Sequence, residues 1–234
     1  MTEEPAGGAL LRLRGVSRRY GERQALHPLD LDVRRGSCTA LYGHNGSGKS
    51  TLLRIAAGRD TPTAGRALFA GRPIDEDDPR VRASVAVVGD MAACYPDLTV
   101  REHLQLVTLA HAVDEPDDWI DRVLADRGLS DHGEALPMSL SSGQLQSLHL
   151  AAALVRPRDL LILDEPEQRL DPAARRRLAG LLRAEKADGV AVLLATHHAE
   201  LAEAVADRMV VLEEGRVIAD GPPSDVLERL ERRS

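Results

Sequence analysis

The sequence predicts an α/β fold: a mainly parallel core sheet with helices on both faces. Two patterns lead to this prediction. The apolar run Cys38–Tyr42 passes through a glycine-rich turn into the helical pattern of Leu52–Ala57, so a buried strand, a turn and a helix follow one another without a gap. The run Leu160–Leu163 ends in two acids and is again followed by a helical pattern. Buried strands that alternate with helices are typical of parallel sheets.

The glycine-rich turn matches the pattern G-x-x-x-x-G-K-S. It reads Gly43-His44-Asn45-Gly46-Ser47-Gly48-Lys49-Ser50-Thr51. Between a strand and a helix this pattern is a P-loop, because its backbone N–H groups and the helix dipole can hold a phosphate chain. We expect Lys49 to reach the β- and γ-phosphates and the Ser50 hydroxyl to hold Mg²⁺. The alternative is a glycine turn that binds nothing, and the strand–turn–helix setting disfavours it.

Charge and composition exclude several functional classes. A formal net charge of −7 over 234 residues gives no basic field for nucleic acid. Cys38 and Cys94 lie far apart and match no zinc or redox pattern, so we expect no zinc and a reducing compartment. No apolar stretch approaches the roughly 20 residues that span a bilayer, and Met1–Pro5 lacks the features of a signal peptide. We therefore expect a cytoplasmic chain that reaches the membrane only through a partner.

The N-terminal region predicts antiparallel strands. Leu10–Arg14 and Leu29–Val33 alternate apolar and polar residues with period two, as half-buried antiparallel strands do. Tyr20 lies between them and precedes a turn glycine. From position alone, it could stack on a base or be an ordinary edge-strand tyrosine. Further strands are predicted at Arg66–Ala70 and Ser84–Val88.

A helical insertion is predicted after these strands. From Asp97 to about Pro157 helical periodicity replaces strand periodicity, beginning with a capping box formed by Thr99 and Glu102. No linker bounds this segment, so we expect one domain over residues 1–234. Its core lobe would comprise residues 1–90 and 155–234, and its helical subdomain residues 91–154.

The later strands carry candidate catalytic groups. Asp164 and Glu165 follow a buried strand, so both carboxylates lie at the sheet edge where open α/β folds bind ligands. We expect Asp164 to meet Mg²⁺ and Glu165 to face the attacking water. A last buried strand, Val190–Ala195, leads to Thr196, His197 and His198. Asp171 and Pro172 open the helix between these strands, and a hairpin with Gly215 in its turn follows them.

These motifs together carry a resemblance to a known family. The P-loop is followed in order by Leu140-Ser141-Ser142-Gly143-Gln144, Leu163-Asp164-Glu165-Pro166, Leu170-Asp171 and Thr196-His197. From about Leu10 to Gly221 the chain resembles the nucleotide-binding subunit of ABC transporters. Leu-Ser-x-Gly-Gln is this family's signature and is more specific than the P-loop. The resemblance implies an ATPase that binds ATP and Mg²⁺, dimerises with an identical or a related subunit, and powers a separate transmembrane permease.

The resemblance also implies roles for single residues. Tyr20 would stack on adenine. Ser141 and Gly143, with Gln144 in the same signature, would meet the γ-phosphate of ATP held by the partner copy. Asp171 would lie on the loop that communicates across the dimer. His197 would be the switch histidine that holds the γ-phosphate, with His198 a solvated neighbour.

Departures from the family pattern bear on the hydrolysis rate. Asp90 stands where the family has a glutamine, and it could still interact with Mg²⁺. Ser142 replaces a glycine; if its backbone were left-handed, the Cβ would cost about 1–2 kcal/mol and Ser142→Gly would raise turnover. Glu167 adds a third acid near the site. The alternative function is therefore a nucleotide-dependent regulatory or binding module with little hydrolysis.

Two features favour export over import. The segment from Tyr95 to Glu102 resembles the corresponding stretch of bacterial drug or ABC-2-type exporter ATPases. The sequence also ends soon after Gly221, without a regulatory extension. We therefore expect an exporter ATPase on the inner face of the cell membrane.

Overall fold

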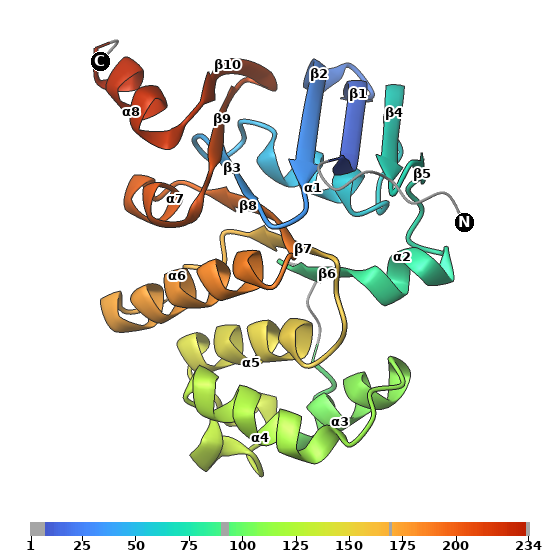
Figure 1. Ribbon diagram of the computed structural model, residues 1–234, viewed down its shortest axis with the longest axis vertical. Coiled ribbons are helices and arrows are strands. Elements are labelled where there is room, and N and C mark those ends of the chain that lie inside the picture. The colour runs from blue at the N-terminus through green and yellow to red at the C-terminus, as the bar shows by residue number, and fades with distance from the viewer. Residues whose placement is uncertain (1–7, 90–93, 169, 233–234) are drawn as a thin grey trace.

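The fold is built on two sheets with one helix packed between them (Figure 1). The computed structural model describes residues 8–89, 94–168 and 170–232. Within them, a six-stranded sheet has the order β10-β9-β3-β8-β7-β6 and a four-stranded sheet the order β2-β1-β4-β5. The strands are β1 Ala9–Tyr20, β2 Arg23–Arg34, β3 Cys38–Tyr42, β4 Ala64–Phe69, β5 Arg72–Pro73, β6 Val85–Val88, β7 Leu160–Asp164, β8 Ala191–Thr196, β9 Arg208–Glu213 and β10 Arg216–Gly221. The α-helices are α1 Lys49–Ala56, α2 Pro79–Ser84, α3 Val100–Ala110, α4 Pro116–Arg127, α5 Ser142–Leu154, α6 Pro172–Ala187, α7 Ala199–Val205 and α8 Pro223–Glu231.

The larger sheet is mainly parallel, as predicted. β3 pairs in parallel with β8 and β9, β7 pairs in parallel with β6 and β8, and β10 is antiparallel to β9. Alternate residues of β7 point to opposite faces of the sheet. Leu160 and Ile162 belong to the core that contains α1, whereas Leu161 and Leu163 belong to the core that contains α6 and α7. Helices therefore cover both faces, and the predicted fold class is confirmed.

The smaller sheet is the predicted antiparallel one. β1 pairs antiparallel with β2 and β4, and both β1 and β2 run to twelve residues, longer than the alternating segments that revealed them. Helix α1 contributes Leu52 and Ile55 to a core that also contains Leu13 of β1 and Leu193 of β8. The helix that follows the P-loop is thus packed between the two sheets.

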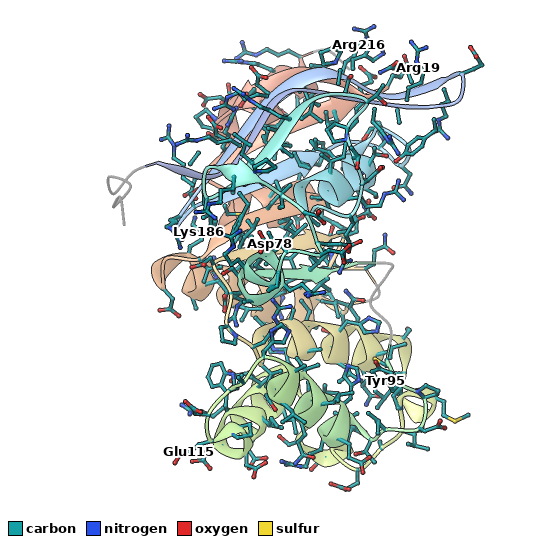
Figure 2. All side chains as sticks on the ribbon, turned by 90° about the vertical axis from the view of Figure 1, so that its right-hand side faces the viewer. Arg19, Asp78, Tyr95, Glu115, Lys186 and Arg216 are labelled. Carbon is teal, nitrogen blue, oxygen red and sulfur yellow. The ribbon has the colours of Figure 1, made fainter. Side chains whose placement is uncertain are left out.

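Helices α3, α4 and α5 gather at the end of the molecule opposite the antiparallel sheet (Figure 1). Tyr95 and Glu115 lie at this end, and Arg19 and Arg216 at the other (Figure 2). The three helices share a core of their own, and Thr99 begins α3 with the predicted capping box. The subdomain boundaries remain a prediction, because α5 also packs Leu150 into the core beside α6.

Several short elements were not predicted. Helices α2, α7 and α8 and strand β5 span nine residues or fewer, so they carry little periodicity for a sequence pattern to reveal. Helix α2 takes Ser84, and the strand predicted from that residue begins at Val85. Among the described residues, no helix is long and apolar enough to cross a membrane.

Candidate active site

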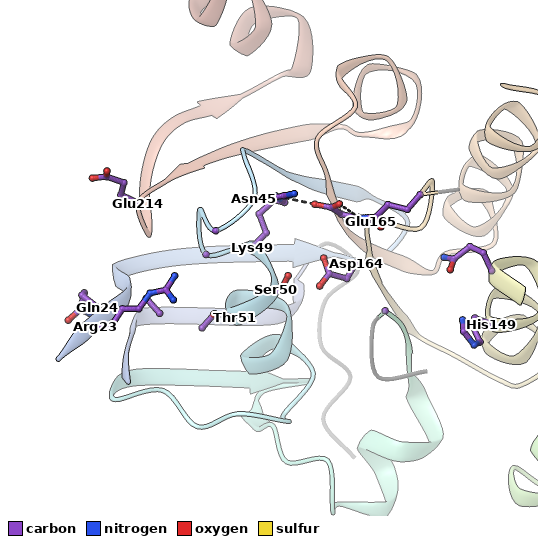
Figure 3. A pocket seen from close by; sticks show the side chains of 16 residues that line it. Arg23, Gln24, Asn45, Lys49, Ser50, Thr51, His149, Asp164, Glu165 and Glu214 are labelled. Atoms are coloured by element: carbon purple, nitrogen blue, oxygen red, sulfur yellow. Dashed lines mark hydrogen bonds and ion pairs between the residues drawn. The ribbon is translucent and has the colours of Figure 1, made fainter. Parts of the chain in front are cut away.

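A cavity of about 760 Å³ opens where the P-loop leaves β3 and the two acids leave β7 (Figure 3). These are the carboxyl ends of two parallel strands that lie on either side of β8, and α/β sheets bind ligands at this edge. The cavity is lined by Arg23, Gln24, Ala25, Asn45, Gly46, Gly48, Lys49, Ser50, Thr51, Gly89, Gln146, His149, Asp164, Glu165, Gln168 and Glu214. The P-loop and both acids, which are far apart in the sequence, therefore share one cavity.

The P-loop lies directly against two other segments of the chain. A Cβ at Gly43 would come within 2.3 Å of the Leu212 carbonyl oxygen in β9. Gly48 has φ 108°, and a Cβ there would lie 2.8 Å from Leu26 of β2. The N–H of Gly215, in the turn between β9 and β10, donates to the Ser47 carbonyl at 2.9 Å. Glycine is required at both P-loop positions because the backbone is approached so closely.

Lys49 links the P-loop to the end of β7. Its buried Nζ donates to the carbonyls of Gly43 at 2.7 Å and His44 at 3.1 Å. The same atom lies 3.3 Å from Glu165 Oε1. A buried ammonium needs such partners, and phosphate oxygens are alternative partners of the same chemistry. Together with the N-terminus of α1, this cation fits a phosphate chain.

Glu165 occupies a strained position at the centre of the site. Its φ is 47°, which is uncommon for a residue with a side chain, and such strain is often found at functional sites. Its N–H donates to the Ala195 carbonyl at 2.9 Å, which ties it to β8. Burial favours a higher pKa for Glu165, but the hydrogen bond from Gln168 and the charge of Lys49 outweigh it and lower the pKa. The carboxylate is therefore ionised.

The two histidines after β8 have different surroundings. Nδ1 of His197 lies 3.2 Å from Glu165 Oε2. The rings of His197 and His198 lie 4.5 Å apart, and the N–H of His198 donates to Thr196 Oγ1 at 2.9 Å. The structure thus places His197, the predicted switch histidine, against the predicted catalytic carboxylate.

Two of the three predicted metal ligands lie in the described part of the chain. Ser50 at the start of α1 and Asp164 at the end of β7 both line the cavity (Figure 3). Asp90 lies outside the described residues. Among those described, no group of three or more His, Cys, Asp and Glu side chains could hold a metal ion. Oxygen ligands of this kind fit Mg²⁺, which takes its other ligands from phosphate and water.

Tyr20 lies apart from the cavity lining and is held by charged neighbours. Its hydroxyl hydrogen-bonds to Asp60 and accepts from Arg54 at 3.2 Å. The Arg18 guanidinium lies 4.5 Å from the ring centroid, within cation–π distance. Tyr20 is 39% exposed, which leaves its ring accessible. Its stacking on adenine stays a prediction.

The signature segment forms the start of α5 and does not line the cavity. Ser141 Oγ accepts from the N–H of Gln144 at 3.3 Å, and the Gln144 side chain accepts from the N–H of Ser141 at 2.8 Å. Ser142 is the first residue of α5, and Gly143 follows it in the same turn. Ser142 is not left-handed in this chain, because helix α5 begins there and its φ is not positive. Its effect on closing the dimer stays a prediction.

Asp171 caps α6 in the way the sequence predicted. Its side chain accepts from the N–H of Ala174 at 2.7 Å. This backbone hydrogen bond lowers the pKa of Asp171. Pro172 then occupies the first helical position, where its missing N–H costs nothing.

Comparison with known proteins identifies the family. Residues 26–168 match the family model described as "ABC transporter". The chain belongs to the ABC transporter family. Among curated relatives, this ABC subunit is 38% identical to the Nod factor export ATP-binding protein I of Cupriavidus pinatubonensis, over 96% of this chain and 70% of the relative.

Solved structures agree with this assignment. The ABC subunit superposes with a TM-score of 0.86 and 31% identity on an ATP-binding subunit of an ABC transporter, covering 96% of this chain and 95% of the other. A dimeric bacterial ABC transporter cassette gives a TM-score of 0.83 at 25% identity, covering 91% and 98%. The predicted resemblance is confirmed: the chain is an ATP-binding, ATP-hydrolysing subunit of a transporter. Such subunits dimerise and work with a membrane component.

Sequence reasoning missed several residues that line the cavity of this ABC subunit. Gln168 donates to Glu165, and Gln146 and His149 reach the cavity from α5. Arg23 and Glu214 line the opposite end (Figure 3). Only Gln168 had a local signal, because it follows the acidic pair by three positions; the others depend on how distant elements pack.

Proposed function

We propose that this ABC subunit binds MgATP in the cavity between the P-loop and β7, and that its hydrolysis drives export through a separate membrane-spanning partner. The observation that carries the proposal is the convergence of Lys49, Ser50, Asp164 and Glu165 on one cavity. These residues supply a cation, a hydroxyl and two carboxylates. Phosphoryl transfer needs this set for positioning and charge stabilisation.

Each side chain has a distinct proposed role. Lys49 neutralises the β- and γ-phosphates, and in doing so exchanges its Glu165 partner for phosphate oxygens. Glu165 is then free to orient the attacking water and accept its proton. Ser50 and Asp164, with Asp90, hold Mg²⁺, which neutralises charge on the phosphates when bound. His197 is close enough to Glu165 to act beside it.

We further propose that the signature residues serve a second copy. Ser141 and Ser142 are exposed and none of the signature residues lines this chain's own cavity. The N-terminus of α5 can hold a phosphate, so Ser141, Gly143 and Gln144 would complete the partner's site, with Asp171 nearby. The solved dimer of a related cassette supports this arrangement. Both a homodimer and a heterodimer satisfy it.

Export and location rest on the relatives. Several curated relatives are named Nod factor export ATP-binding protein I. Their name describes those proteins, and it supports an export role here. A place at the inner face of the cell membrane follows from the proposed membrane-spanning partner. The cargo would contact the membrane partner, so the ATPase chain carries no cargo site in this proposal.

A steady-state ATPase assay tests the function. The purified chain is reconstituted with its membrane partner, and phosphate release is followed with Mg²⁺ and with excess EDTA. We expect Mg²⁺-dependent turnover that the partner stimulates. ATP binding without measurable turnover in the complete complex would instead support the regulatory module.

A further inference from the structure

Two links join the turn after β7 to the end of β8. The outer link, at the cavity, is the 3.2 Å contact between Glu165 and His197. The inner link is a hydrogen bond from the Thr196 hydroxyl to Glu167 Oε1. Glu167 follows Glu165 by two residues and Thr196 precedes His197 by one, so the links run side by side.

The inner link is fully buried. Glu167 is 2% exposed and Thr196 is 0% exposed. Thr196 Oγ1 also accepts from the N–H of His198 at 2.9 Å. The second oxygen of Glu167, Oε2, is buried and has no hydrogen-bond partner in the described part of the chain. An unsatisfied buried polar atom costs free energy of folding, so this acid is a poor choice for stability alone.

The turn that carries both acids is itself well defined. The N–H of Gln168 donates to the Glu165 carbonyl at 3.1 Å, and the N–H of Leu170 donates to the Glu167 carbonyl at 3.2 Å. Glu165 and Glu167 therefore belong to one hydrogen-bonded turn, two residues apart. The backbone of Glu165 is left-handed, and a strained residue keeps its conformation only when its surroundings fix it.

We propose that Glu167 is a positioning residue, which holds the β7 turn against Thr196 and so sets the spacing between the Glu165 carboxylate and the His197 imidazole. This inference rests on the proposed role of Glu165 in hydrolysis. Glu167 does not line the cavity, so it acts through Glu165 and does not itself take the proton from water.

The burial of Glu167 makes glutamine a suitable test substitution at this position. Burial raises the pKa of Glu167, and the bond from Thr196 offsets this only in part. Glutamine has the same shape and keeps an oxygen that can accept from Thr196, without the charge that burial disfavours. Glu167→Gln should keep the link, whereas Glu167→Ala removes it.

The experiment compares kcat and KM for ATP in the assembled transporter. We expect Glu167→Ala to lower kcat by roughly ten- to a hundredfold, the scale of a misplaced catalytic group, with KM changed less than about twofold. Glu167→Gln should recover most of the turnover. Thr196→Val removes the same link from the other side and should reproduce the loss of kcat, including where Glu167→Ala does not fold.

Two controls separate positioning from stability. Glu185 is a second buried acid, paired with Arg158 away from the cavity, and Glu185→Gln should leave kcat unchanged even where it lowers the thermal midpoint. Adding Glu167→Ala to His197→Ala should cost less than the two single effects combined, because both act on one contact.

Distinct results would overturn the inference. Unchanged kcat in Thr196→Val and in folded Glu167→Ala would exclude positioning, and so would a Glu167→Gln variant as slow as Glu167→Ala. Full turnover in Glu165→Gln would instead refute the proposed function. A slow Glu165→Gln variant beside an active Glu167→Ala variant would refute this inference alone.

Discussion

The P-loop and the signature segment are both recognisable motifs at the start of a helix, and the structure uses them differently. At the P-loop, the two acids at the end of β7 line the same cavity, and Lys49 is bonded to three other groups. At the signature, Ser141 and Gln144 bond to each other, and neither lines the P-loop cavity of its own chain. One motif builds a site within the chain, and the other, in our proposal, serves the site of a second copy.

This difference predicts that variants at the two motifs have different effects. Variants at the P-loop end should change nucleotide binding or chemistry in each copy. Variants at the signature end should leave ATP binding to the monomer intact and change only what the dimer does. The four predictions that follow run from the largest effect to the smallest.

Lys49→Ala should abolish tight MgATP binding and hydrolysis, because it removes the charge that neutralises the β- and γ-phosphates. Isothermal titration with MgATP and a phosphate-release assay measure the two effects. Micromolar affinity together with normal turnover would show that the P-loop is not the phosphate site.

Glu165→Gln should keep ATP binding and slow hydrolysis by roughly two to four decades, the contribution of a general base. An ATP-bound dimer should then accumulate, which size-exclusion chromatography with MgATP detects. A monomer with unchanged turnover would move the catalytic role to another acid. It would also remove the predicted difference in effect between P-loop variants and signature variants.

His197→Ala should depress turnover by roughly tenfold or more, as expected for a group acting with the base, and His198→Ala should have little effect. Of these two histidines, only His197 has a contact with Glu165 in the described part of the chain. The pair are adjacent and chemically identical, so each serves as the control for the other. Equal losses would mean that contact with Glu165 does not matter.

Ser142→Gly should change turnover by no more than about threefold, because serine and glycine differ by about 0.5 kcal/mol in helix propensity. Ser142 already has a helical backbone, so glycine relieves no strain there. Ser142→Ala, measured in parallel at saturating MgATP, tests the hydroxyl. A clear gain with glycine but not alanine would show that dimer closure forces a different backbone at this position.

Local patterns predicted most of the fold and only part of the site. The P-loop, the acids after β7 and the capping box at Thr99 each lie within a few consecutive residues, so the sequence displays them directly. The parts of the cavity supplied by Arg23 and His149 depend on tertiary packing between distant elements, and no local signal marks them. The backbone at Ser142 was misjudged for a related reason: its conformation depends on where α5 begins.

The contacts of the P-loop with β9 and with the turn after it also have a consequence for biosynthesis. The ribosome makes Gly43 and Ser47 well before their neighbours Leu212 and Gly215. Domains generally begin to fold during synthesis from the N-terminal side. Until β9 and the turn after it have been synthesised, the phosphate-binding loop lacks its contacts with them. The nascent chain therefore completes its nucleotide site only after β9 and the turn that follows it have been translated.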